Sequence, residues 1–278
     1  MKKILVPVDF SQQSNEAYTV ALDWAQSTKG EIVLVHVLVP PGPYVGLAGE
    51  TIAYDMTYFT QMEADIKKAL QKMKERAGSV PVTTDIVYGD LVSGISNVIE
   101  KKEIDFIIIG TSGASGLTET FIGSNTEKVV RFSTVPVLAV RKSIAIKSIK
   151  NILLPSTLNL NQTDFIQKLK SLQKLLHATL HILLINTPLH FRRDAEANEA
   201  LGDFVRHYGL TNYKLYFRSY THEQEGILNF ASVEKMDLVA MATHARKGLA
   251  HLFNGSITEN VVNHTDAPIW TYRLKDHV

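Results

Sequence analysis

The chain has 278 residues, a length that suits two compact domains rather than one. The charges of its 29 basic and 28 acidic residues nearly cancel, so the chain lacks the net positive charge typical of nucleic-acid-binding proteins. Cysteine is absent, so disulfides, thiolate metal sites and cysteine nucleophiles are excluded. No apolar run reaches the roughly 20 residues that span a bilayer, and the first residues turn polar too soon for a signal peptide. We expect a cytoplasmic protein with no nucleic-acid or membrane partner.

Short apolar runs alternate with helical patterns along the first half of the chain. Strands are expected at 3–8, 32–37, 82–88, 105–110 and 135–141, and helices at 15–27, 55–77, 91–102 and 124–132. Strands that are apolar at every position are typical of a parallel sheet covered by helices on both faces. Right-handed crossovers then predict a doubly wound α/β fold.

An internal repeat relates the second half to the first. A shift of 132 residues places 105–141 on 237–273 with thirteen identical positions, among them Asp105/Asp237 and Gly123/Gly255. A shift of 148 residues aligns 4–7 with 152–155. The difference of 16 residues indicates an insertion in the first copy. We place this insertion at the Pro- and Gly-rich segment 40–54, and expect it to be a mobile flap near the first-copy site.

The second copy predicts the same alternation of strands and helices. Its strands are expected near 151–155, 180–186, 213–219, 237–242 and 267–273. The polar, alternating segment 142–150 separates the copies, so we expect domains at 1–142 and 150–278. The copies differ in surface charge, because residues 1–141 carry 13 basic and 16 acidic residues and residues 142–278 carry 16 and 12.

The candidate site lies where the first-copy strands end. Doubly wound sheets bind ligands beyond the carboxyl ends of their strands, where the strand order reverses. The first strand ends in Pro7-Val8-Asp9, and the fourth continues into Gly110-Thr111-Ser112-Gly113; nine residues later Gly123-Ser124-Asn125-Thr126 opens a helix. Glycine at 110 and 113 permits positive φ and close approach of a ligand. Free N–H groups at the helix start favour an anion, so the sequence predicts a phosphate cradle facing a carboxylate.

Each of these residues also has a plainer interpretation. Asp9 can cap the turn that follows its strand, and glycines punctuate many strand–loop junctions. The hydroxyls of Ser124 and Thr126 can cap their helix instead of binding a ligand. The combination, rather than any one residue, favours a nucleotide.

The sequence Val6-Pro7-Val8-Asp9-Phe10-Ser11, with the glycine pattern above, resembles the universal stress protein family in its ATP-binding branch, and the resemblance covers both halves. It implies two tandem domains with the adenine nucleotide alpha-hydrolase-like fold. The glycine loop would wrap the triphosphate, the first-strand aspartate would contact the adenosine, and the residue after His36 would line the adenine pocket. Family members commonly have histidine where Ser112 stands. Carried over position by position, the implied nucleotide-binding residues are Pro7, Val8, Asp9, Val37, Ile109, Gly110, Ser112, Gly113, Gly123, Ser124, Asn125 and Thr126.

The second copy departs from this pattern. Asp9 is replaced by Thr157, Gly110 by Ala242 and Gly113 by Ala245, whereas Gly255-Ser256 is retained. An alanine in a left-handed conformation costs about 1–2 kcal/mol, and its methyl group would crowd a phosphate. We therefore expect one ATP per chain, with or without Mg, in the first domain.

Enzyme signatures are missing from the sequence: it contains no G-x4-G-K-[ST], G-x-G-x-x-G, G-x-S-x-G or H-E-x-x-H motif. The predicted function is therefore a regulatory or sensor protein of the stress response, with at most slow ATP hydrolysis. Two alternatives stay open: an ATP-using transferase or hydrolase on the same scaffold, and an interaction scaffold that binds no nucleotide.

Two further features complete the predictions. His177 and His181 have a metal-like spacing, and His244 and His251 flank a basic pair, but we interpret them as surface or hydrogen-bonded histidines rather than metal ligands. The last strand of each copy should lie at a sheet edge, and exposed edges are normally covered. In dimers of the resembled family these strands are mutual partners. We expect an antiparallel pair within one chain, as an intramolecular pseudo-dimer, with a homodimer as a further option.

Overall fold

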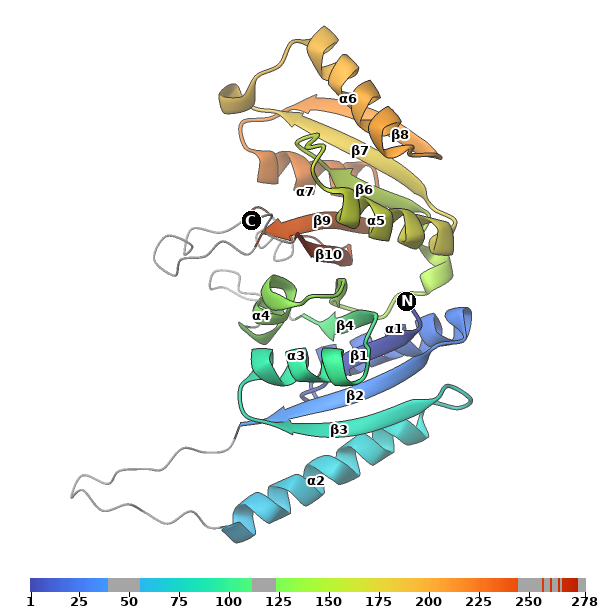
Figure 1. Ribbon diagram of the computed structural model, residues 1–278, viewed down its shortest axis with the longest axis vertical. Helices are drawn as coiled ribbons and strands as arrows, with labels where there is room; N and C mark the ends of the chain where they lie inside the picture. The colour runs from blue at the N-terminus through green and yellow to red at the C-terminus, as the bar shows by residue number, and fades with distance from the viewer. Residues whose placement is uncertain are drawn as a thin grey trace, which may run out of the picture.

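A computed structural model describes residues 1–39, 56–111, 124–244, 257, 261, 265 and 267–274. The strands form one ten-stranded sheet in the order β3-β2-β1-β4-β5-β10-β9-β6-β7-β8 (Figure 1). The first half contributes β1 (Lys3–Pro7), α1 (Gln12–Thr28), β2 (Glu31–Leu38), α2 (Met56–Glu75), β3 (Val82–Tyr88), α3 (Leu91–Lys101), β4 (Phe106–Gly110), α4 (Ser124–Phe132) and β5 (Val137–Val140). The second half contributes β6 (Asn151–Pro155), α5 (Thr163–Leu176), β7 (Thr179–Asn186), α6 (Asp194–Tyr208), β8 (Tyr213–Ser219), α7 (Glu223–Val233), β9 (Leu238–His244) and β10 (Ile269–Leu274).

The predicted α/β architecture is confirmed, with parallel pairing inside each half of the sheet. One boundary differs by a full turn of helix. Helix α1 begins at Gln12 rather than at residue 15, because the Ser11 side chain caps it and accepts a hydrogen bond from the backbone N–H of Ser14 at 3.2 Å. Among the described residues, no helix is both long and apolar enough to cross a membrane.

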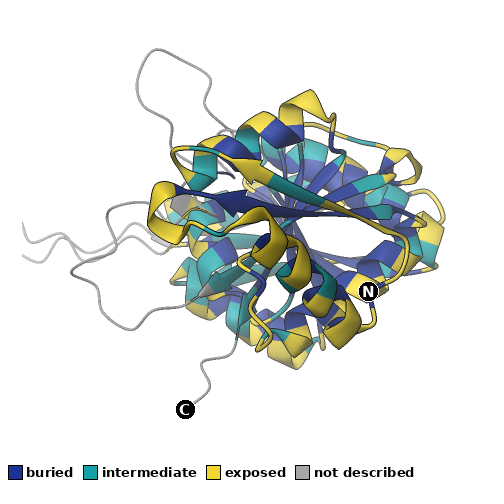
Figure 2. Ribbon diagram, turned by 90° about the horizontal axis from the view of Figure 1, so that it is seen from above, coloured by how far each residue is buried: buried dark blue, intermediate teal, exposed yellow. Residues whose placement is uncertain are grey.

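Two apolar layers, one on each face of the sheet, hold the helices in place. Ile4 and Val6 pack in the layer beneath α1, α2, α5 and α6, whereas Leu5 between them packs in the layer beneath α3, α4 and α7. Figure 2 shows the buried strands in the middle and the helices outside with their exposed faces outward. The alternation explains why inner strands such as β1 and β4 are apolar along almost their whole length, since both of their faces are covered, whereas the edge strands β3 and β8 also carry exposed polar residues.

The two halves join through β5 and β10, which pair antiparallel as predicted. Leu138 lies opposite Trp270, and these two residues occupy the same position in the two copies of the repeat. On either side, Ala139 pairs with Ile269 and Val137 pairs with Thr271. Since Val137 corresponds to Ile269 and Ala139 to Thr271 in the repeat, replacing each residue by its counterpart turns one pair into the other. Such a register is that of a local two-fold axis passing between Leu138 and Trp270.

The connecting segment 142–150 is more firmly held than its polar sequence suggests. It contains a turn of 3-10 helix at Ile146–Ser148, and the side chains of Ile146 and Ile149 are buried in the core. Two carboxylates of α1 accept hydrogen bonds from its backbone: Glu16 from the N–H of Ser143 at 2.7 Å, and Asp23 from the N–H of Ile146 at 2.6 Å. The segment therefore lies along α1 rather than crossing open solvent.

The β5–β10 junction predicts a large effect of one core truncation. Leu138 is almost completely buried at the local two-fold axis, so Leu138→Ala should lower the free energy of unfolding by about 2–5 kcal/mol. Urea denaturation followed by circular dichroism measures this loss. Leu189→Ala is the control, because the Leu189 side chain is 90% exposed and its loss should change stability by less than about 0.5 kcal/mol. Equal effects of the two substitutions would contradict the junction as a source of stability.

Candidate functional site

The candidate site lies where the strand order of the first half reverses. Strand β1 has β2 on one side and β4 on the other, so successive strands run outward from β1 in opposite directions. The carboxyl ends of β1 and β4 flank this switch point, which is the usual ligand position in doubly wound sheets. Of the predicted residues, Pro7 is the last residue of β1, Val8 and Asp9 follow it, and Ile109 and Gly110 end β4.

Asp9 presents an exposed carboxylate at this point. Its Oδ1 accepts a hydrogen bond from the backbone N–H of Ser11 at 3.0 Å, so the aspartate also caps the turn before α1, as the plainer interpretation holds. Partial burial raises the pKa of Asp9, but hydrogen bonds from Ser11 and Ser14 outweigh that effect and leave the pKa below its ordinary value. The carboxylate is therefore ionised at neutral pH, and its remaining lone pairs can accept from a ligand.

The turn after β1 has a backbone conformation that is rare for residues other than glycine. Phe10 has a φ of +64°, and its counterpart after β6, Leu158, has the same φ. In the first half the Phe10 ring stacks on His36 with 5.0 Å between ring centroids, and the His36 Nδ1–H donates to the carbonyl oxygen of Val8 at 2.8 Å. These contacts fix the ends of β1 and β2 against each other. Sequence inspection gave no sign of the Phe10 conformation.

Val37 and Ile109 belong to one apolar layer. Both side chains pack against the core layer of α3 and α4, at the carboxyl ends of β2 and β4. Val37 is half-buried and Ile109 is buried, so an apolar wall lies at these strand ends. The adenine contact that the family resemblance implies for Val37 stays a prediction.

Gly110 is needed for packing. Its φ is not positive, so the left-handed conformation that glycine permits is not used here, whereas close approach of a ligand to Gly110 stays a prediction. A Cβ on Gly110 would instead lie 2.2 Å from the carbonyl oxygen of Gln13, because the first turn of α1 approaches the end of β4 at this point. In the second half α5 begins only at Thr163, the counterpart of Asn15, so the early helical turn is absent and Ala242 occupies the position of Gly110.

One threonine links the end of β4 to helix α4. The Thr126 hydroxyl donates to the carbonyl oxygen of Gly110 at 2.8 Å, so this residue holds the helix start against the strand. Thr111 follows β4 and is only 4% exposed, yet its hydroxyl has no hydrogen-bond partner in the described part of the chain. The hydroxyl of Thr243, the equivalent residue of the second half, is buried without a described partner in the same way, so this feature belongs to both copies. Asn125 is exposed in the first turn of α4.

Several predicted residues lie outside the described part of the chain. These are Ser112, Gly113 and Gly123 of the predicted cradle, the side chain of Ser124, the proposed flap at 40–54, and the second-copy loop with Ala245, His251 and Gly255. Their places at the site stay predictions.

The two histidines of the second half with metal-like spacing have different surroundings in the structure. His177 ends α5 in a left-handed conformation. His181 is buried on β7, with Nδ1 3.1 Å from the Tyr216 hydroxyl and Nε2 3.1 Å from Oδ1 of Asn151. Within the described ranges, no group of three His, Cys, Asp or Glu side chains is placed to hold a metal ion. His181 is thus a hydrogen-bonded core histidine, as interpreted from the sequence.

Comparisons with known proteins agree with this geometry. A sequence profile described as the universal stress protein family matches residues 1–141 and 218–273. A universal stress protein of Methanocaldococcus jannaschii is 34% identical over 142 residues, which is 51% of this chain and 82% of that protein. One from Synechocystis sp. is 23% identical over 98% of this chain and the whole of that protein.

A solved structure supports the arrangement of the whole fold. The crystal structure of a universal stress protein from Archaeoglobus fulgidus superposes with a TM-score of 0.76 at 18% identity, and the match covers 98% of each chain. At this level of identity the likeness concerns the fold alone.

The close approach of α1 to Gly110 predicts that adding a methyl group at residue 110 lowers stability more than removing one at the equivalent residue 242. Gly110→Ala should lower the free energy of unfolding by about 1–3 kcal/mol, because the new Cβ overlaps the Gln13 carbonyl. The reverse change in the second half, Ala242→Gly, should cost at most about 1 kcal/mol, since it only frees the backbone. Chemical denaturation of both variants tests this difference. A harmless Gly110→Ala would show that α1 does not approach β4 so closely.

The burial of His181 predicts loss of stability in acid. Burial lowers the pKa of His181, and Lys214 lowers it further against the opposing effects of Glu234 and Asp237. Because the unfolded chain then binds the proton more tightly, stability falls as pH drops below the unfolded value of about 6.5, by up to about 1.4 kcal/mol per pH unit. Urea midpoints between pH 7.5 and 5 measure the slope. His181→Val, which copies the equivalent Val33, should flatten it; an unchanged slope would assign the effect to other groups.

Proposed function

Because this chain belongs to the universal stress protein family, we propose that its first half binds ATP and that nucleotide occupancy regulates its role in a stress response. The observation that supports the proposal is the switch point between the neighbouring strands β1 and β4: the ionised carboxylate of Asp9 follows β1, Ile109 lies at the end of β4, and Thr126 of α4 donates to the Gly110 carbonyl at that same end. An acceptor, an apolar surface and a helix N-terminus are the three features that ribose, adenine and phosphate require.

The described residues fit such a ligand. Asp9 would accept a hydrogen bond from a ribose hydroxyl, and Val37 and Ile109 would contact the adenine ring. Free N–H groups in the first turn of α4, from Ser124 to Thr126, would face the phosphates. The Thr111 hydroxyl, buried and without a partner among described residues, is available to donate to an anion beside Gly110. Pro7, Val8, Ser112, Gly113 and Gly123 complete the proposed contacts.

ATP would supply a triphosphate charge and a transferable phosphoryl group. The chain's own part is to bind and orient it, because the sequence carries no recognised motif for activating water or an acceptor. We therefore propose a sensor with at most slow hydrolysis, in the cytoplasm, rather than an enzyme. Strong turnover with an added acceptor would favour a transferase or hydrolase on this scaffold.

We also propose that residues 1–142 and 150–278 are two domains that associate as an intramolecular pseudo-dimer. The antiparallel β5–β10 pair and its repeat-related register support this division. The expected binding stoichiometry is one nucleotide per chain, because the second half has Thr157 and Ala245 where the first has Asp9 and Gly113.

A matched pair of substitutions tests the proposed site. Gly123→Val should place a bulky side chain where the sequence pattern puts the phosphates and abolish ATP binding, whereas Gly255→Val, at the same position of the second copy, should leave it nearly unchanged. Isothermal titration measures affinity and stoichiometry. Ligand at 100 times Kd should add about 2.7 kcal/mol of stability to the wild type and to Gly255→Val only. A stoichiometry of two, or equal losses in both variants, would overturn the assignment to the first half.

A further inference from the structure

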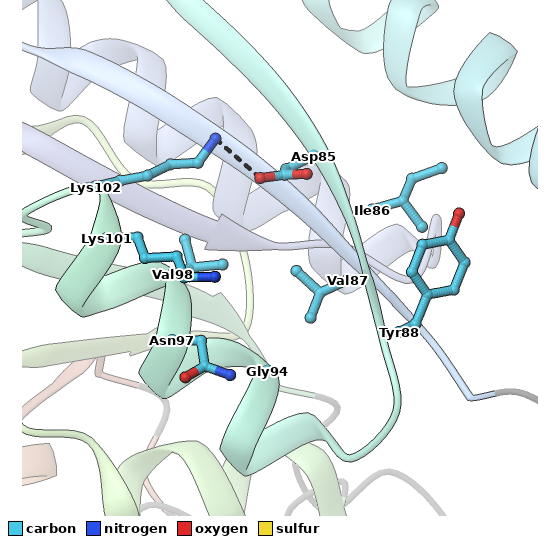
Figure 3. Close-up of a pocket in the computed structure, with 9 residues that line it drawn as sticks. All are labelled: Asp85, Ile86, Val87, Tyr88, Gly94, Asn97, Val98, Lys101 and Lys102. Atoms are coloured by element: carbon cyan, nitrogen blue, oxygen red, sulfur yellow. Dashed lines mark ion pairs between the residues drawn. The ribbon is translucent and has the colours of Figure 1, made fainter.

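A second possible binding surface lies at the free edge of the sheet, away from the switch point. Strand β3 is at one end of the sheet order, and no strand of the described residues lies beyond it. Between β3 and α3 there is a cavity of about 270 Å³ (Figure 3), here called the β3–α3 groove. Its lining residues are Asp85, Ile86, Val87, Tyr88, Gly94, Asn97, Val98, Lys101 and Lys102.

The backbone of β3 has unused hydrogen-bonding groups along this edge. The carbonyl oxygen of Pro81 accepts from the N–H of Ile32, and the N–H of Gly89 donates to the carbonyl of Leu38, so both point toward β2. Successive residues of a parallel strand direct their N–H and C=O groups to opposite sides of the strand. Since those of residues 81 and 89 point toward β2, those of Thr84 and Ile86 point away from the sheet. An added strand would find donors and acceptors at the usual two-residue spacing.

Side chains alternate in the same way. In Figure 3, Asp85 and Val87 point toward α3, and Ile86 and Tyr88 point to the other side of the strand. Tyr88 lies near helix α2, with its ring 6.1 Å from that of Phe59. Every second side chain of a strand added beside β3 would therefore enter the groove, and the others would lie on the α2 side.

The polar groups in the groove carry a net positive charge. Lys102 forms an ion pair with Asp85 at 2.9 Å. Lys101 has no ion-pair or hydrogen-bond partner among the residues the structure describes, and the same is true of Asn97, one helical turn earlier on α3. Val87 and Val98 supply apolar surface between them. An acidic side chain flanked by aliphatic ones complements this lining.

The second half shows how the same space looks when it is filled. Tyr216 takes the place of Asp85 and Phe230 that of Val98, and their rings meet at 4.8 Å in an edge-to-face contact. The Tyr216 ring also stacks on that of His181, with 5.5 Å between the ring centroids. In the second half two aromatic side chains therefore fill this space, whereas the first half has a smaller and a charged residue, Val98 and Asp85, at the same two positions.

We propose that the β3–α3 groove is a docking site for an extended acidic peptide segment of a partner protein, which adds to the sheet as a strand beside β3. Main-chain hydrogen bonds to Thr84 and Ile86 supply affinity, as in other cases of strand addition. Lys101 and Asn97 bind an acidic side chain, and Val87 and Val98 contact its aliphatic neighbours. The surface is independent of the proposed nucleotide site.

A labelled heptapeptide tests this proposal on the full chain. Its second and sixth residues are valine, its fourth is glutamate and the rest are threonine, with both ends blocked. Fluorescence anisotropy should show saturable binding, which Lys101→Glu and replacement of the peptide's glutamate by glutamine should each weaken about tenfold. Lys174→Glu, the same charge reversal on α5, should leave the affinity unchanged.

Backbone pairing is tested at Ile86. Ile86→Pro removes an outward N–H without touching the β2–β3 hydrogen bonds, so it should weaken binding, whereas Ile86→Ala keeps the N–H and should not. Val98→Phe, which copies Phe230, should close the groove in a chain that still folds by circular dichroism. Absence of saturable binding at millimolar peptide, affinity unchanged by Lys101→Glu and Ile86→Pro, or self-association of the chain through β3 in sedimentation would each overturn the proposal. ATP titration of the same variants should be unaffected.

Discussion

The antiparallel contact between β5 and β10 is the constraint on which the rest of this structure depends. Each half ends in a short apolar strand whose outer edge would otherwise be open to solvent or to another chain. Pairing the two edges, with Leu138 opposite Trp270, turns two five-stranded sheets into one sheet of ten. The register relates equivalent residues by a local two-fold axis, so a single chain satisfies what a symmetric dimer would otherwise need two chains to satisfy. Among the strands that the structure describes, β3 and β8 lie at the two ends of the sheet.

Some identities between the two copies have a structural rather than a functional cause. Asp105 accepts hydrogen bonds from the backbone N–H groups of Lys2 and Lys3, and Asp237 accepts them from Lys150 and Asn151. In each half one carboxylate joins the start of the first strand to the start of the fourth strand, at the ends opposite to the switch point. The repeated aspartate fixes the register of the strands whose opposite ends form the candidate site.

The two halves have the same arrangement of strands and helices, but they differ in the side chains at the sheet edge and at the carboxyl ends of the strands. The first half has an exposed carboxylate at Asp9 and an unfilled groove along β3, whereas the second half fills the corresponding groove with Tyr216 and Phe230 and buries His181 against them. The linker lies along α1, because Glu16 and Asp23 accept hydrogen bonds from its backbone, and the first turn of the same helix lies against Gly110.

The amino-acid sequence by itself determined the repeat and the order of strands and helices, which follow from local periodicity and from rules of connection between residues close together in the chain. The pairing of the last strands followed from their open edges together with the family resemblance, and the same resemblance, rather than periodicity, singled out Val37 and Ile109 alongside Asp9. Only the tertiary structure decided why residue 110 is glycine, that Thr111 is buried without a partner, that Phe10 adopts a left-handed conformation, and that the space beside α3 is open in one half and filled in the other. Each of these depends on which atoms from distant segments meet, and a carbonyl such as that of Gln13, 97 positions away from Gly110, leaves no mark in the local pattern of residues.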